Sequence, residues 1–278
     1  MLTIMIKLGE NSYGKNAVQL SKIIRHPDHH EFRQITVNVS LKGDFETAHT
    51  LGDNTKILPT DTQKNTVYAL AKEHFTTSIE AFALHLAEHF VHTQQQVATA
   101  TVEIAETAWS RITPHAYISG GAEKRTTQVI YNAATTTITS GITDLLILKT
   151  TDSGFEHFIK DPYTTLKETS DRIFATQCEA SWIYKGAIKD YSVLFDNIRA
   201  TLLATFAGHN SLSVQQTLFA MGEAVLETYP AVKEITLKMP NKHHVLFNLE
   251  QFGMSNQNEV FIATDEPYGY IVGTVIRE

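Results

Sequence analysis

The chain has 278 residues, 42% of them hydrophobic and 19% charged, which fits one large globular domain or two smaller ones. Its net charge of −7 argues against nucleic acid as the main partner, because phosphate binding needs a concentrated basic face. Cys178 is the only cysteine, so no intrachain disulfide can form, and no stretch approaches the roughly 18 apolar residues of a membrane span. We therefore expect a cytoplasmic protein with neither nucleic acid nor a membrane as partner.

Two strands are predicted near the start of the chain. From Phe32 to Leu41, apolar and polar side chains alternate almost residue by residue, which indicates a strand with one buried and one wet face. Residues 17–24 can pair with this strand across the turn signal Pro27-Asp28. The two segments are thus predicted to form an antiparallel hairpin.

Two helices and two further strands complete the first half. An apolar stripe at Ile79, Phe82, Leu86 and Phe90 predicts an amphipathic helix, with Ser78 as its N-cap. An earlier helix is predicted to begin near Asp61. Residues 97–109 and 127–138 are rich in Thr, Val and Ala, which favours strands.

The second half repeats this order. The predicted elements are strands at 145–149 and 175–184, helices at 193–206 and 214–229, and strands at 232–239, 245–249 and 271–276. Each half is therefore a ββααββ unit, and we expect an α+β protein with units at residues 1–139 and 140–278. Several strands carry many Thr, Ser and Gln residues, which suits the lining of a wet barrel. Closing such sheets into a barrel is expected to need more than one chain, because the unpaired groups of an open sheet edge tend to pair with another chain.

Some residues in the first half have both a structural and a functional interpretation. Lys15, at the start of a strand, would by itself be a solvated surface residue. Thr60 or Asp61 would cap the helix that follows Pro59. The N–H groups free at a helix start can instead bind an anion or a carbonyl oxygen. A threonine hydroxyl held by a neutral lysine amine can also relay a proton.

The second half offers a similar choice. Phe155 follows a glycine and would ordinarily be a packing residue. Arg172 could form an ion pair on the surface with Asp171 or Glu168. Alternatively, its planar guanidinium could hold a planar anion through two parallel hydrogen bonds. The remaining candidates are Val214 and Gln215 at a helix start, and Asn241 and His243 in a turn-like segment. A buried glutamine amide can present a donor and an acceptor to a heterocycle.

The 13 histidines raise the question of a metal site. His85, His89 and His92 share one helix face, with a spacing that could bind zinc or nickel, but they lie beside the apolar stripe and are expected to face solvent. His26, His29 and His30 are likewise expected on the surface of a turn. Zinc motifs, glycine-rich phosphate loops and dinucleotide fingerprints are absent from the sequence. We accordingly expect no metal and no cofactor.

Several stretches, taken in order, resemble the urate oxidase (uricase) family, and bacterial members in particular. They are Tyr13-Gly14-Lys15, Ala48-His49-Thr50, Thr60-Asp61-Thr62-Gln63-Lys64-Asn65-Thr66, Leu148-Lys149-Thr150, the run from Asp161 to Arg172, Ser213-Val214-Gln215-Gln216-Thr217, Pro240-Asn241-Lys242-His243-His244 and Asn258-Glu259-Val260-Phe261. They span nearly the whole chain, and the runs around Thr60 and from Tyr163 to Arg172 are the most specific. Residues 94–123 fit the family's pattern less well.

The resemblance implies a tunnelling fold, in which two chains close one barrel and two barrels stack into a homotetramer. It also implies active sites between chains that act on urate and O2 without a cofactor. One chain would supply Lys15, Thr60 and Asp61. Its neighbour would supply Phe155, Arg172, Val214, Gln215, Asn241 and His243.

The resemblance further implies a role for each of these residues. Phe155 would stack on the purine, with Arg172, Gln215 and the Val214 backbone holding one edge of urate. Thr60 and the Asp61 N–H would hold the other edge, and Asn241 and Thr60 would flank O2. Lys15, Thr60 and His243 would relay protons to give 5-hydroxyisourate and H2O2. The alternatives are a non-catalytic purine-binding protein of the same fold and a metal-dependent enzyme that uses the helix histidines.

Overall fold

The computed structural model describes residues 6–278, and they divide into two compact units. The first unit comprises the chain up to Ser140 together with Lys189–Ser192, and the second comprises Gly141–Ile188 and Val193–Glu278. The described residues contain ten strands and five α-helices. The α+β class expected from the sequence is confirmed.

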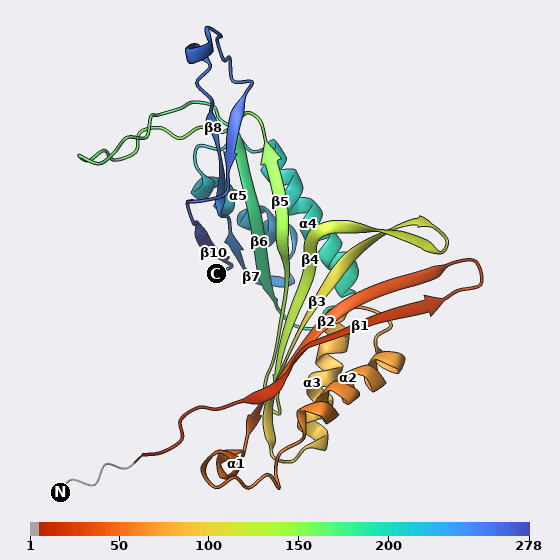
Figure 1. The fold of residues 1–278 in the computed structure, drawn as a ribbon. Helices are drawn as coiled ribbons and strands as arrows, with labels where there is room; N and C mark the ends of the chain where they lie inside the picture. The colour runs from red at the N-terminus through yellow and green to blue at the C-terminus, as the bar shows by residue number, and fades with distance from the viewer. Residues whose placement is uncertain (1–5) are drawn as a thin grey trace, which may run out of the picture. The chain divides into compact units, whose positions relative to one another are not determined.

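The first unit is a four-stranded antiparallel sheet in the order β1-β2-β3-β4, with helices packed on one face (Figure 1). Its elements are β1 (Tyr13–Arg25), β2 (His30–Gly43), α1 (Glu46–Thr50), α2 (Thr60–His74), α3 (Ile79–Thr93), β3 (Val97–Thr113) and β4 (Ala116–Asn132). The predicted hairpin is confirmed, since β1 pairs with β2 along most of its length.

The two faces of this sheet differ as the alternation in β2 predicts. Val37, Val39 and Leu41 are fully buried in the core that the helices cover. On α3, Ser78 caps the first turn by accepting a hydrogen bond from the Ala81 N–H at 3.1 Å, as expected. The opposite face carries the intervening polar side chains of β2 and of its neighbour β3, so the first unit has one dry and one wet face.

The second unit follows the same element order, with its sheet in the order β5-β6-β7-β10 (Figure 1). Its elements are β5 (Thr136–Lys149, which begins in the first unit), β6 (Phe174–Tyr184), α4 (Tyr191–Gly208), α5 (Val214–Thr228), β7 (Val232–Lys238), β8 (Asn241–Leu246), the 3-10 helix η1 (Glu250–Phe252), β9 (Phe261–Thr264) and β10 (Val272–Ile276). Strand β8 lies outside this strand order. Its first two residues pair with β6, and its remaining residues pair with β9.

Two predicted strands differ from the structure. The strand expected at 127–138 is two strands, β4 and β5, because the Asn132 side chain accepts hydrogen bonds from the Ala134 and Thr135 N–H groups and turns the chain. The strand expected at 245–249 is β8, which begins at Asn241 and ends at Leu246. Its partner β9 was not predicted at all, since four residues carry too little periodicity to mark a strand.

Candidate active site

Lys15 lies beside a β-bulge in β1. The pairing with β2 shifts register between Lys15 and Val18, and Ala17 adopts a left-handed conformation with φ 56°. The Ala17 N–H is held by the Asn38 side-chain oxygen at 2.8 Å. At Gly14, a Cβ atom would lie 1.8 Å from the Val39 carbonyl oxygen, so only glycine fits there. A bulge of this kind redirects the neighbouring side chain, in this case the half-buried Lys15.

Thr60 and Asp61 form the first turn of α2, and neither of them caps it. The N-cap position is Pro59, which provides no side-chain hydrogen bond, so the capping interpretation is wrong. The Asp61 carboxylate bonds within its own helix, to Lys64 at 2.5 Å and to Asn65 at 3.0 Å. The Thr60 hydroxyl has no hydrogen bond to another described residue, and the N–H groups of the first turn remain available, as at any helix start.

Tyr13 connects the strand that carries Lys15 to the segment that carries Thr60. Its hydroxyl oxygen accepts a hydrogen bond from the Leu58 N–H at 2.9 Å, and its ring packs edge-on against Phe45 with the centroids 4.7 Å apart. Burial raises the pKa of Tyr13. Tyr13 stands two residues before Lys15, and Leu58 stands two residues before Thr60. The hydrogen bond between Tyr13 and Leu58 therefore ties the chain segment beside Lys15 to the one beside Thr60.

Two further observations support this arrangement. The fully buried Gln63 donates its side-chain amide to the Leu58 carbonyl oxygen at 3.3 Å, so Leu58 is held on both sides. The pKa of Asp61 is lowered mainly by its hydrogen bond to Lys64, and the charge of Lys15 also contributes. Lys15 therefore lies within electrostatic range of the start of α2. The segments that carry the three candidates of the first unit are thus joined by the Tyr13–Leu58 hydrogen bond.

In the second unit, Phe155 and Arg172 are neighbours. Phe155 forms two backbone hydrogen bonds with Thr169, of 2.8 and 3.1 Å, and its ring stacks on Phe158 with the centroids 5.0 Å apart. The Arg172 Cζ atom lies 5.4 Å from the Phe155 ring centroid. The Arg172 guanidinium carbon thus lies over the Phe155 ring.

Arg172 does not form the surface ion pairs considered above. Asp171 instead accepts hydrogen bonds from Thr151 and from a backbone N–H, and Glu168 pairs with Lys160 at 2.9 Å. Burial lowers the pKa of Arg172. Its buried Nε atom has no hydrogen-bond partner among the described residues. Because an unsatisfied buried donor on a guanidinium is costly, this geometry favours an anionic ligand.

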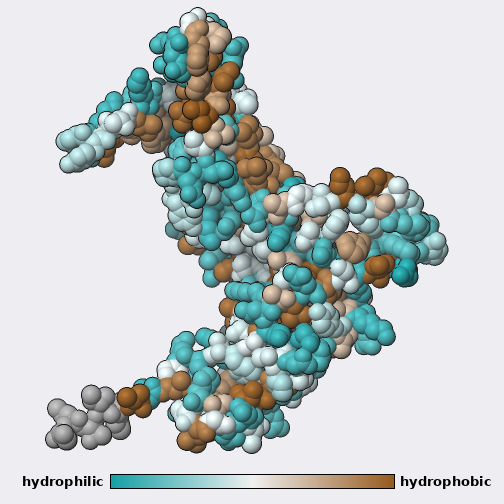
Figure 2. Space-filling view, viewed as in Figure 1, coloured by the Kyte–Doolittle hydropathy of each residue, from teal (hydrophilic) through white to brown (hydrophobic). Residues whose placement is uncertain are grey.

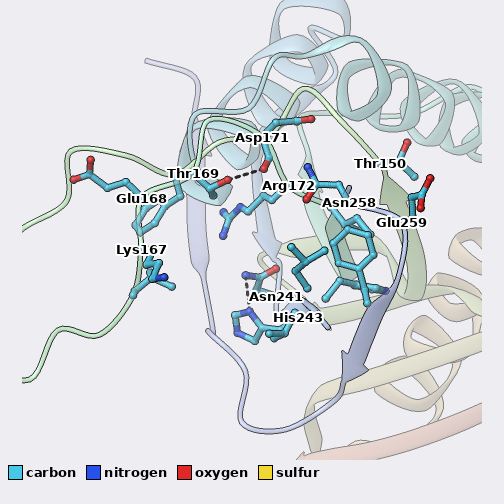
Figure 3. Close-up of a pocket in the computed structure, with 17 residues that line it drawn as sticks. Thr150, Lys167, Glu168, Thr169, Asp171, Arg172, Asn241, His243, Asn258 and Glu259 are labelled. Carbon is cyan, nitrogen blue, oxygen red and sulfur yellow. Dashed lines mark hydrogen bonds between the residues drawn. The ribbon is translucent and has the colours of Figure 1, made fainter. Parts of the chain in front are cut away.

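Asn241 and His243 lie on β8, with the Asn241 Nδ2 and His243 Nδ1 atoms 3.5 Å apart. Together with Phe155 and Arg172 they line one cavity of about 830 Å³ in the second unit (Figure 3). Other residues of the lining were not among the sequence candidates, namely Thr150, Leu166, Lys167, Glu168, Thr169, Asp171, Ile173, His244, Val245, Leu246, Asn258, Glu259 and Phe261. Asn258 could have been noticed, because it stands in a matched stretch and asparagine tolerates the left-handed conformation that it adopts.

Val214 and Gln215 do not line this cavity. They are the first residues of α5, and the segment before this helix is hydrogen-bonded to the segment that carries Phe155. The Gly154 N–H donates to the Ser211 carbonyl oxygen at 2.8 Å, which joins the segment before α5 to the residue before Phe155. Val214 is buried and Gln215 is exposed. The candidate residues thus form two groups, one in each unit.

Comparison with known proteins decides the family. The family model described as Uricase matches residues 11–130 and 138–272. The chain is 44% identical to the uricase of Arthrobacter globiformis, over 98% of this chain and 91% of that protein, and 37% identical to the uricase of Dictyostelium discoideum, over 98% of each. The chain belongs to the uricase family.

The solved structures agree with this assignment. A crystal structure of the Arthrobacter globiformis uricase superimposes with a TM-score of 0.96 at 43% identity, over 99% of this chain and 96% of that one. The urate oxidase of Bacillus sp. TB-90 shares the fold, with a TM-score of 0.84 at 22% identity, over 96% of this chain and 100% of that one. The expected tunnelling fold is thereby confirmed. The uricase family match also runs through residues 94–123, which fit the family's pattern less well by inspection of the sequence.

Proposed function

We propose that this chain is a urate oxidase that converts urate, O2 and H2O into 5-hydroxyisourate and H2O2 without a metal or an organic cofactor. Two electrons pass from the purine to O2, and the oxygen of water is added to the purine. The observation that carries the proposal is the buried, unpartnered Nε of Arg172 beside the Phe155 ring. A planar purine anion can accept parallel hydrogen bonds from the guanidinium, and it can stack on the Phe155 ring by displacing Phe158 from it.

Substrate binding in this proposal uses both groups of residues. Phe155 and Arg172 hold the purine, helped by Gln215 and the Val214 backbone at the start of α5. The Thr60 side chain and the Asp61 N–H hold the opposite edge, supported by the uncapped first turn of α2.

The proton relay would run through Lys15, Thr60 and His243. Deprotonated urate is electron-rich, so the protein needs only to hold it, place O2 and move protons. Asn241, 3.5 Å from His243, would flank O2 together with Thr60. The Thr60 hydroxyl suits the relay because no described residue competes for its hydrogen bonds.

The assembly that we propose is a homotetramer with active sites between chains. Its support is that Lys15, Thr60 and Asp61 belong to one unit and the other candidates to another. Among the described residues, β1 and β10 end the strand order with one neighbour each, so their outer edges can pair with a second chain. Exposed apolar side chains on β5, β8 and β9, including Leu146, Val245 and Ile262, add surface for association (Figure 2).

A direct assay tests the proposal. Purified protein in chelator-treated buffer is mixed with urate, and the loss of urate absorbance, O2 consumption and H2O2 formation are followed together. Equal molar rates of the three support the oxidase. Tight urate binding without O2 consumption would favour the purine-binding alternative, and activity that requires an added metal would refute the cofactor-free reaction.

The metal-dependent alternative has less support. His85 stacks on His74 with the ring centroids 3.8 Å apart, and His92 bonds to the Tyr131 hydroxyl at 2.9 Å. Within residues 6–278, the helix histidines do not gather with other ligand side chains into a metal-binding group. We also propose a cytoplasmic location, on the ground that the single cysteine is a buried free thiol. No helix among the described residues is long and apolar enough to cross a membrane.

A further inference from the structure

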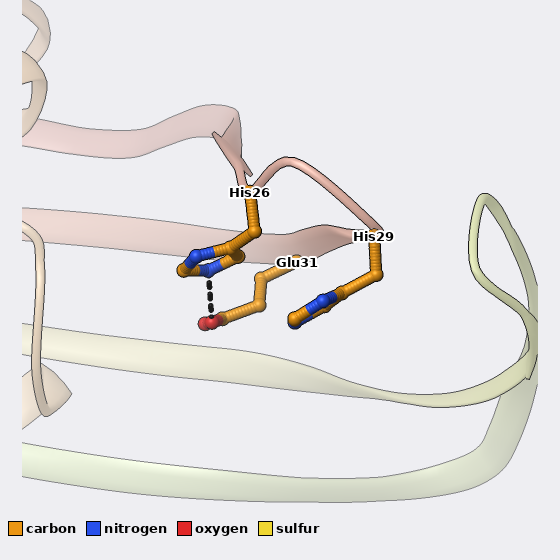
Figure 4. A group of neighbouring side chains, drawn as sticks. All are labelled: His26, His29 and Glu31. Atoms are coloured by element: carbon orange, nitrogen blue, oxygen red, sulfur yellow. Dashed lines mark hydrogen bonds and ion pairs between the residues drawn. The ribbon is translucent and has the colours of Figure 1, made fainter.

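A cluster of metal-ligand side chains lies at the β1–β2 turn, outside the candidate active site. His26, His29 and Glu31 project to the same side of the hairpin (Figure 4). The turn is closed by a hydrogen bond of 2.9 Å from the His26 N–H to the His29 carbonyl oxygen. We propose that these three side chains bind one divalent transition-metal ion of the zinc type.

The ligand atoms are close to the spacing that such an ion needs. One atom from each of the three side chains lies within 4.8 Å of the other two, and the His26 Nε2 atom is 2.6 Å from the Glu31 Oε1 atom. Tetrahedral zinc with bonds of about 2.0–2.1 Å holds its ligands about 3.3 Å apart. The His26 and His29 rings are nearly parallel, with centroids 4.5 Å apart, and both side chains are only partly buried, so the rings have room to rotate toward an ion.

Asp28 provides an independent indication of a metal site. Its carboxylate oxygen lies 2.8 Å from the Nδ1 atom of His29. A histidine that donates its Nδ1–H to a carboxylate keeps its Nε2 atom unprotonated and basic. This carboxylate–histidine pair is the usual outer partner of a metal-binding imidazole.

The surrounding charges set a limit on affinity. His30 stands between His29 and Glu31 in the chain, and its surroundings are cationic or protonatable. They are Arg25 on β1, Arg111 at the end of β3 and His115 in the turn before β4. These cationic or protonatable groups oppose the cation, while Glu31 and Asp28 favour it. Because imidazole binds a metal ion only in its neutral form, acid should release the ion.

The cluster is well separated from the proposed chemistry. Lys15 lies near the start of β1 and His26 directly follows its end, eleven residues later, which is roughly 35 Å at the rise of a β-strand. A metal ion at the turn would therefore stabilise the β1–β2 hairpin and leave urate oxidation unchanged. The proposal thus stands or falls independently of the oxidase function.

The test is zinc titration of the purified, metal-stripped full-length protein by calorimetry at pH 7.5, with Co²⁺ absorption as a second readout. We expect one ion per chain, a rise in Tm with zinc, and at least tenfold weaker binding in His29→Gln. Asp28→Asn should weaken binding by about 10–100-fold. His30→Gln is the matched control: it removes the adjacent histidine, which faces His115, and should bind zinc as well as the parent.

Three results would overturn the proposal. The first is the absence of saturable zinc binding at one ion per chain. The second is unchanged affinity in His29→Gln, and the third is an equal loss in His29→Gln and His30→Gln, which would indicate non-specific binding to histidines. Urate turnover, measured in parallel, should be the same in all variants and reports whether each is folded.

Discussion

Tyr13→Phe tests the idea that one hydrogen bond positions Lys15 against Thr60. The substitution removes the oxygen that accepts the Leu58 N–H at 2.9 Å and keeps the ring that packs against Phe45. Leaving a half-buried N–H without its acceptor costs about 1–3 kcal/mol. The Leu58 carbonyl stays bonded to Gln63, so the loop remains attached but is free to shift.

The matched control is Tyr68→Phe. Tyr68, on α2, donates its hydroxyl to the Gln19 carbonyl oxygen of β1 at 3.0 Å, so it also joins this helix to this strand. It is 45% exposed and lies away from both proposed relay residues, and its loss should cost about 0.5–1.5 kcal/mol of stability with no change in chemistry. Comparing the two variants separates an effect on the position of Lys15 and Thr60 from a general loss of contact between α2 and β1.

The assay is steady-state urate oxidation across pH, together with urea unfolding of both variants. Because a displacement of about 1 Å at a reacting group can cost 10²-fold, we expect kcat of Tyr13→Phe to fall about 10–10²-fold, with a smaller change in KM. Equal kcat in the two variants, or a fall in kcat no larger than the loss of folded protein, would refute the positioning role of Tyr13.

Three further predictions follow from the site and the core. Lys15→Met and Thr60→Ala should each lower kcat by about 10²–10⁴-fold with little loss of urate binding by calorimetry, and a loss confined to binding would contradict the relay. Arg172→Lys should raise the Kd for urate at least tenfold, because lysine cannot form two parallel hydrogen bonds; unchanged affinity would remove Arg172 from the site. Arg125→Met should destabilise the protein by about 3–5 kcal/mol in urea, since Glu80, fully buried and 2.7 Å from Arg125, would keep an uncompensated charge. Recovery of most of this loss in a double variant with Glu80→Gln would confirm the cause.

Local patterns in the sequence predicted much of the fold. The alternation in β2 and the apolar stripe of α3 depend on periodicities of two and 3.6 residues, which short-range geometry imposes on any strand or amphipathic helix. The Ser78 cap acts within a single helical turn and was likewise predictable. The order of elements in the two halves, and hence the α+β class, follows from these local signals alone.

Elements stabilised by distant partners could not be predicted in this way. Strand β9 exists because it pairs with β8, and β8 begins earlier than predicted because Asn241 pairs with Thr176 of β6. Neither short strand has a pattern of its own, since the hydrogen bonds that define it come from segments far away in the sequence.

The candidate residues show the same division. Their identities, from Lys15 to His243, were available from the order of motifs along the chain, because a motif records residue types. Whether Arg172 forms a surface ion pair or keeps a buried donor free, and whether Thr60 caps α2 or keeps its hydroxyl free, depended on which groups the fold brings near them. The same is true of His26 and His29, which the sequence placed on the surface of a turn and which the hairpin brings together with Glu31. Sequence by itself therefore determined the elements and the chemistry available, and only the tertiary structure decided the partners of each group, because burial and hydrogen bonding are non-local.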